Sequence, residues 1–263
     1  MWASILSLSF LASLLVYAYN VLANFQQSSS IDSKQVLILT AHPDDECMFF
    51  GPTITALRSV SKTRVHVLCL STGNADGLGV TRKKELTRSC QVLGIPPSNV
   101  KALDHAELQD GMKNTWSPSL IATIIKDYVS KHKIDTMITF DDYGVSGHPN
   151  HIAAYNGARH FIESCKDKIK LYTLSSILLP RKYIGIGDLV FMTIEKRLFH
   201  NKKKEENEED VVFVSSPLDY LISHKAMRRH DSQLVWFRWL YVTFSRYMFV
   251  NQLVAVNSVA HSK

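Results

Sequence analysis

The chain has few cysteines, and they show no pattern that would build a scaffold. Four occur among 263 residues, at Cys47, Cys69, Cys90 and Cys165, and none forms a C-x-x-C pair. A disulfide-stabilised fold and a zinc finger are therefore excluded. We expect four free thiols and a reducing compartment.

Signatures of nucleic-acid binding are missing as well. There is no RNP pattern and no paired Cys/His finger, and the net charge of +6 is spread diffusely along the chain. Such a charge suits an anionic lipid or an acidic small substrate better than a nucleic acid. We expect no nucleic-acid partner.

Charged side chains are absent from residues 2–25, WASILSLSFLASLLVYAYNVLANF. As a helix this run would extend about 36 Å, and a bilayer core is about 30 Å thick. We expect a transmembrane anchor over residues 1–25, followed by a polar linker over residues 26–34. A cleaved signal peptide is the rival interpretation, but a basic n-region is missing and the apolar run is long.

Basic residues are unevenly placed around this expected anchor. No Lys or Arg precedes it, whereas Lys34 lies just beyond it and more basic residues follow. The positive-inside rule then places the bulk of the protein in the cytosol. The free thiols agree with that side.

Beyond the linker, short apolar runs alternate with helical patterns. This alternation predicts an α/β, Rossmann-like and mostly parallel sheet with helices on both faces, in one domain over residues 35–256. Strands are expected at Gln35–Thr40, Val65–Leu70 and Thr136–Phe140, and helices near Gly51–Val60, Thr81–Leu93 and Leu120–Lys131.

Three other segments stand out by composition. Residues 200–210, HNKKKEENEED, carry no apolar side chain and are expected to form a solvated loop, and residues 257–263 a tail. Residues 236–256 are rich in aromatics and interrupted by Arg238 and Arg246. They suit either a buried terminal element, which we favour, or an interfacial, lipid-facing one.

The first motif with chemistry is AHPDDE, directly after the first expected strand. His42 and Asp45 are three residues apart, which puts both on the same side of a turn, as a metal ion requires. Asp44 points elsewhere but stays nearby. The alternative is that these acids merely cap a helix N-terminus.

The second motif, GHPNH, contains His148 and His151 and follows the strand TMITF. Ligands of such sheets bind at the carboxyl ends of the strands. We therefore expect His42, Asp45 and His151 to hold Zn²⁺, or another divalent metal, with one position open, as in a catalytic site. A magnesium pocket of paired acids would leave both histidines without a role.

Together, AHPDDE and GHPNH resemble the motifs of the PIG-L/LmbE-like deacetylases, and the resemblance covers about residues 35–251. Within that family the chain is similar to the eukaryotic membrane branch. That branch deacetylates N-acetylglucosaminyl-phosphatidylinositol at the endoplasmic reticulum, the second step of glycosylphosphatidylinositol-anchor (GPI-anchor) synthesis. The expected anchor, the segment STGNADGLGVTRKKEL and the aromatic tract WFRWLYVTFSRYMFVNQL carry this narrower resemblance.

The resemblance implies a role for each residue of the two motifs. His42, Asp45 and His151 would bind the metal, Asp44 would be the general base, and His148, in protonated form, would stabilise the oxyanion.

Outside the motifs, the resemblance implies that Arg82 holds substrate, although a helix-surface arginine is an equal alternative. Asp110 and His105 are weaker substrate-binding candidates. Asn150 replaces an acid found in many bacterial relatives and is not expected to be a ligand.

The expected function is thus zinc-dependent hydrolysis of the N-acetyl group of a membrane glycolipid. The expected location is the endoplasmic reticulum membrane, with a single pass and the catalytic domain in the cytosol. Two alternatives stay open: a deacetylase of a soluble N-acetylglucosamine conjugate or oligosaccharide, and a non-enzymatic membrane scaffold. The sequence does not identify a protein partner.

Overall fold

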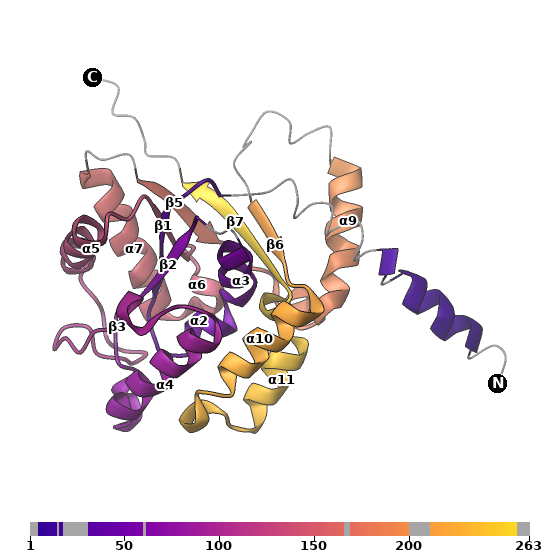
Figure 1. The fold of residues 1–263 in the computed structure, drawn as a ribbon, viewed down its shortest axis with the longest axis horizontal. Coiled ribbons are helices and arrows are strands. Elements are labelled where there is room, and N and C mark those ends of the chain that lie inside the picture. Colours follow the sequence, from indigo (N-terminus) through magenta and orange to yellow (C-terminus); the bar gives the residue numbers. More distant parts are fainter. Residues whose placement is uncertain are drawn as a thin grey trace, which may run out of the picture.

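A computed structural model describes residues 5–14, 16–17, 31–59, 62–165, 169–199 and 211–256. Its centre is a seven-stranded sheet in the order β3-β2-β1-β4-β5-β7-β6, shown in Figure 1. The strands are β1 (Gln35–Thr40), β2 (Arg64–Cys69), β3 (Val100–Ala102), β4 (Thr136–Phe140), β5 (Lys170–Leu174), β6 (Val211–Val214) and β7 (Val250–Val256).

Strands β1 to β5 run parallel, and β7 lies antiparallel between β5 and β6. β1 pairs with both β2 and β4, so the strand order reverses there. The expectation of a mostly parallel, Rossmann-like sheet is confirmed. Its switch point lies at the carboxyl ends of β1 and β4, where both motifs begin.

Helices cover both faces of the sheet. In Figure 1, α5 and α7 lie on one side, and α3, α4 and α10 lie on the other. Because both faces are covered, β1 and β4 are nearly continuous apolar runs rather than alternating ones. The helices are α2 (Asp45–Met48), α3 (Gly51–Ser59), α4 (Gly79–Val92), α5 (Pro118–His132), α6 (Gly144–Gly147), α7 (Pro149–Ser164), α8 (Leu179–Lys182), α9 (Asp188–Phe199), α10 (Pro217–Met227) and α11 (Trp236–Phe244).

Three of these helices begin with the same local chemistry. Ser117, His148 and Ser216 are N-cap residues whose side chains accept a backbone N–H of the first turn, and each is followed by proline. Proline suits the first helical position because it needs no amide partner there. In α7 the N-cap position holds His148, one of the residues of the GHPNH motif.

The expected anchor lies only partly within the described residues. Residues 5–14 and 16–17 are helical. Across the described part of the chain, no helix combines the length and the apolar character needed to cross a membrane. The transmembrane prediction is thus not supported by the described part of the chain, and residues 1–4, 15 and 18–25 of the expected anchor lie outside it.

Other expected segments have different outcomes. Residues 200–210 and 257–263 lie outside the described residues. Residues 31–34 of the expected linker pack on the domain, where Ile31 is buried and the backbone N–H of Lys34 donates to Asp135. The aromatic tract divides in two: β7 joins the sheet, while α11 exposes large apolar side chains.

Candidate active site

The chain turns sharply between β1 and α2, at Asp44. This residue has a φ of 115°, a region that residues other than glycine avoid. Its N–H donates to Glu46 Oε2 at 3.0 Å, and its carbonyl accepts from Met48 N at 3.0 Å. Backbone strain of this kind persists only where surrounding contacts hold it, and it often marks functional sites.

Glu46, which holds the amide of Asp44, is itself paired with a distant histidine. His230 Nε2 lies 2.7 Å from Glu46 Oε1, and both side chains are fully buried. Burial alone would raise the pKa of Glu46, but His230 holds it below its ordinary value. Burial would likewise lower the pKa of His230, yet Glu46 raises it.

Asp45 uses its two carboxylate oxygens differently. Oδ2 accepts from the backbone N–H of Ala41 at 3.0 Å and of His42 at 2.8 Å. Oδ1 faces His151 Nε2 at 3.3 Å. Burial would raise the pKa of Asp45, but His151 and His42 keep it below the ordinary value, so the carboxylate is ionised.

His151, from the first turn of α7, is held by its other nitrogen. Nδ1 lies 3.0 Å from the carbonyl oxygen of Gly144 and can donate to it, which directs Nε2 into the site. The ring stacks on Phe140 at 4.0 Å between centroids. Nε2 is buried and has no hydrogen-bond partner among the described residues, which fits a nitrogen meant for a metal.

His42, His148 and His151 gather their ring nitrogens within 4.8 Å of one another. Imidazoles with the free oxygen of Asp45 make a mixed N/O donor set of the kind that zinc prefers, so the residues fit a metal ion. The sequence placed His148 outside the ligand set. The structure puts it beside the other two histidines, so which three residues coordinate stays a prediction.

His42 has two further polar neighbours. Its Nε2 lies 3.0 Å from Asp110 Oδ1 and 3.1 Å from Asn150 Oδ1. Burial would lower the pKa of His42, but Asp110 and Asp45 raise it above the ordinary value. Asp110 thus lies at the site as expected, but its carboxylate contacts His42. Its substrate-binding role stays a prediction.

The carboxylate of Asp44 is paired with two arginines. Oδ2 lies 3.1 Å from Arg238 Nη2 and 3.6 Å from Arg82 Nη2. Burial raises the pKa of Asp44, Arg238 opposes that rise, and the neighbouring charge of Asp45 adds to it. A carboxyl whose pKa is raised toward neutral is suited to general-base chemistry.

Arg82 does not lie on the helix surface, which was the alternative to a substrate-binding role. Its guanidinium is buried and donates to the carbonyls of Gly73 and Pro43 at 2.9 and 2.8 Å. These bonds tie the loop after β2 to the loop after β1. His105, by contrast, hydrogen-bonds within its own loop, to Glu107 and Gln109.

His148 is half-buried at the edge of the site. Its Nδ1 accepts from the N–H of Asn150 at 3.2 Å, so in the neutral ring the proton sits on Nε2. Burial, His42 and His151 lower the pKa of His148 to about 4. With Nδ1 accepting, the neutral ring can donate from Nε2–H, and its surroundings disfavour the protonated form expected above. The role of His148 stays a prediction.

Three residues of the site escaped the sequence-based prediction. Arg238 interrupts an aromatic run, which is a weak signal, and Glu46 belongs to the AHPDDE motif but was given no role. His230 has no local signal at all. Glu46, Cys47 and His230 form a second group close enough to hold a metal. Cys47 is not prepared for that role, because burial raises the pKa of its thiol, which donates a hydrogen bond to the Asp44 carbonyl at 3.2 Å.

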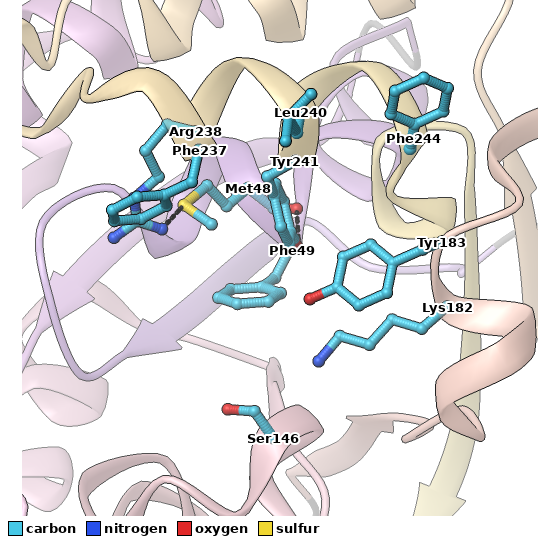
Figure 2. Close-up of a pocket in the computed structure, with 10 residues that line it drawn as sticks. All are labelled: Met48, Phe49, Ser146, Lys182, Tyr183, Phe237, Arg238, Leu240, Tyr241 and Phe244. Atoms are coloured by element: carbon cyan, nitrogen blue, oxygen red, sulfur yellow. Dashed lines mark hydrogen bonds between the residues drawn. The ribbon is translucent and has the colours of Figure 1, made fainter.

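A pocket of about 570 Å³ opens beside the histidines, between α11 and the end of α8. In Figure 2 the Lys182 ammonium and the Tyr183 hydroxyl point into it, and Phe49, whose ring lies 5.5 Å from that of His151, forms the wall toward the site. It is lined by Met48, Phe49, Ser146, Lys182, Tyr183, Phe237, Arg238, Leu240, Tyr241 and Phe244.

Known proteins resemble this chain in sequence and in fold. A probable N-acetylglucosaminyl-phosphatidylinositol de-N-acetylase of Schizosaccharomyces pombe is 40% identical, over 93% of this chain and 97% of its own length. A Bos taurus protein named N-acetylglucosaminyl-phosphatidylinositol de-N-acetylase is 39% identical, over 83% of this chain and 82% of its own.

The N,N'-diacetylchitobiose deacetylase from Pyrococcus horikoshii shares the fold, with a TM-score of 0.60 at 16% identity, over 87% of this chain and 85% of that one. Residues 37–162 match the family PIG-L, described as GlcNAc-PI de-N-acetylase. This match spans both motifs and the strands that carry them. The chain therefore belongs to the PIG-L family of N-acetylglucosaminyl-phosphatidylinositol de-N-acetylases.

Proposed function

We propose that the chain is an amide hydrolase that removes the N-acetyl group of N-acetylglucosaminyl-phosphatidylinositol. Glucosaminyl-phosphatidylinositol and acetate would be the products, in the second step of GPI-anchor biosynthesis. The names of the two relatives support the substrate. The observation that carries the chemistry is the meeting of both His-Pro motifs at the ends of β1 and β4.

His42, Asp45 and His151 would hold the metal, which we propose to be zinc. When bound, zinc would polarise the acetyl carbonyl and lower the pKa of a water. Two of these side chains are preset for this role: Asp45 by two backbone N–H groups, and His151 by the carbonyl of Gly144. The orphaned Nε2 of His151 supports the assignment.

Asp44 is the group in this site that would move the proton. It would take one from the attacking water and give it to the amide nitrogen as the C–N bond breaks, so that a neutral amine leaves. Water and amide thereby become amine and acetate. Its raised pKa suits both steps, since a strongly acidic carboxyl would be a poor acceptor.

His148 would donate from Nε2–H to the acetyl oxygen as negative charge develops there. The neutral ring can do so, since its Nδ1 accepts from Asn150 N and leaves Nε2–H free to donate. Preset donors aimed at a developing oxyanion are worth about 10²- to 10³-fold in rate.

The proposed setting is the endoplasmic reticulum membrane, with a single pass and the catalytic domain facing the cytosol. Lys34 and the basic residues after it support that orientation through the positive-inside rule. A lipid-borne substrate also favours an enzyme held at the membrane, because the search is then confined to a surface.

Release of acetate is the direct test. The purified full chain should release acetate from N-acetylglucosaminyl-phosphatidylinositol in vesicles faster than from a soluble N-acetylglucosamine conjugate or a chitin-type oligosaccharide. The reverse preference would favour the soluble-sugar alternative. Metal analysis of the purified chain tests the other alternative, a non-enzymatic membrane scaffold, because a scaffold predicts neither acetate release nor stoichiometric zinc.

A further inference from the structure

Helix α11 carries a row of large apolar side chains on its outer side. Trp236, Phe237, Leu240 and Phe244 are 75%, 51%, 50% and 50% exposed, and we call these four the docking face. Trp236, Leu240 and Phe244 are spaced four residues apart, and Phe237 is next to Trp236 and three residues before Leu240, so the four share one side of the helix. Tyr241 and Val242 are buried against the domain.

An exposed apolar face of this kind costs free energy in water unless something covers it. A surface helix normally turns its apolar side to the core and a charged side to solvent. In α11 the outer side is apolar too, and the only charged side chain of the helix is Arg238, which reaches inward to Asp44. Contiguous exposed apolar surface marks an interaction site.

The docking face forms one rim of the pocket beside the site. Phe237, Leu240 and Phe244 line it directly, and Trp236 contacts Phe237 with ring centroids 5.9 Å apart. The opposite rim, Tyr183 at the end of α8, is 44% exposed, and Leu179 on the same helix is 70% exposed. Figure 2 shows this arrangement, with α11 along one side and Lys182 and Tyr183 on the other.

The charge around the docking face is positive. Residues 217–244 hold four cations and two carboxylates, Asp219 and Asp231. Lys225, Arg228 and Arg229, at the end of α10, are exposed. Arg228 lies over the ring of Trp239, with its guanidinium carbon 5.3 Å from the centroid.

Apolar and aromatic side chains flanked by Lys and Arg fit one kind of surface in particular. Tryptophan and tyrosine settle at the level of lipid headgroups, and basic residues beside them bind anionic lipid. We propose that the docking face is a membrane-contact surface that seats the mouth of the pocket on an anionic phospholipid leaflet. The contact is separate from the anchor expected in residues 1–25, and it does not depend on which substrate the site cleaves.

Tryptophan fluorescence can test this contact locally in the full chain. The chain has four tryptophans, Trp2, Trp116, Trp236 and Trp239. In a Trp2→Phe background, phosphatidylserine-containing vesicles with brominated acyl chains should quench Trp236 and Trp239. Trp116 is buried and serves as the internal reference. The triple variant Trp2→Phe/Trp236→Phe/Trp239→Phe should lose the quenched component.

A charge placed on the docking face should weaken the contact. In the same background, Trp236→Glu should reduce the quenching of Trp239 by at least about twofold, because a carboxylate resists the apolar layer and anionic headgroups. Ser130→Glu, on exposed α5 surface, should leave it unchanged. Circular dichroism of both variants separates this effect from unfolding.

Quenching of Trp236 and Trp239 no stronger than that of Trp116 would overturn the proposal and point to a protein as the cover of this face. The proposal would also be overturned if Trp236→Glu and Ser130→Glu changed the quenching of Trp239 equally while both variants stayed folded. Equal quenching in vesicles of phosphatidylcholine alone would overturn the requirement for anionic lipid. None of these outcomes depends on acetate release, so the proposed reaction stands or falls separately.

Discussion

Arg238 donates a hydrogen bond to the carboxylate of Asp44 across 3.1 Å, although 194 residues separate the two in the sequence. Asp44 stands at the start of α2 and Arg238 on α11, whose outer side forms the docking face. The guanidinium favours the ionised form of the carboxyl and so limits how far burial raises its pKa. The proposed base and the proposed membrane-contact helix are thus physically joined.

Arg238→Ala should move the pH dependence of the reaction. Without the cation, the pKa of Asp44 rises, so less of the carboxylate is ionised at a given pH. The acidic limb of the kcat/KM profile should therefore shift to higher pH, and Arg238→Lys should restore part of the shift. Arg159→Ala, which removes an exposed pair with Glu163, is the matched control and should leave the limb in place.

Asp44→Asn should lower turnover by at least about 100-fold while bound zinc is retained. Asparagine tolerates a positive φ better than most residues, so the strained turn is kept and mainly the proton acceptor is lost. Turnover and zinc content should be measured side by side. Asp127→Asn, on the exposed side of α5, should match the wild type; unchanged turnover in Asp44→Asn would remove Asp44 from the role of base.

His151→Ala should lose both zinc and activity, with the rate falling more than about 100-fold, beyond what is typical when a residue that merely orients a ligand is removed. His160→Ala, on the exposed side of the same helix, should keep both. Metal analysis after dialysis provides the readout. Full zinc occupancy in His151→Ala would show that the ion is held elsewhere.

His230→Ala should destabilise the fold by about 3–5 kcal/mol, because it leaves Glu46 buried without its partner. The free energy of unfolding from denaturant titration measures this loss. His224→Ala, on the partly exposed side of α10, should cost far less. A similar cost for both variants would mean that the Glu46–His230 pair does not stabilise the fold.

The same pair predicts a pH window for stability. The pKa of His230 is raised on folding, so its contribution is complete below the ordinary value of 6.5 and is lost as the pH rises through the folded value. The pKa of Glu46 is lowered, so its contribution is complete above 4.5 and is lost as the pH falls through the folded value. The stability difference between wild type and His230→Ala should be largest between these two pH values.

Much of the fold was predictable because its signals are local. The runs Gln35–Thr40 and Thr136–Phe140 are strands with the expected bounds, since strands buried on both faces are short and continuously apolar. The transmembrane prediction for residues 1–25 is not supported by any described helix, and part of that segment lies outside the described residues. Composition left the aromatic tract ambiguous, and the structure divides it into an exposed helix and a strand of the sheet.

By itself, the sequence determined the α/β class, three central strands of the sheet and the two His-Pro turns, because strand pattern and turn chemistry act over a few residues. Only the tertiary structure decided what meets those turns. It brought His230 to Glu46, Arg238 to Asp44 and Asp110 to His42, and it put His148 beside two other imidazoles. Contacts between distant segments, and the pKa shifts that burial causes there, depend on packing that no local pattern records.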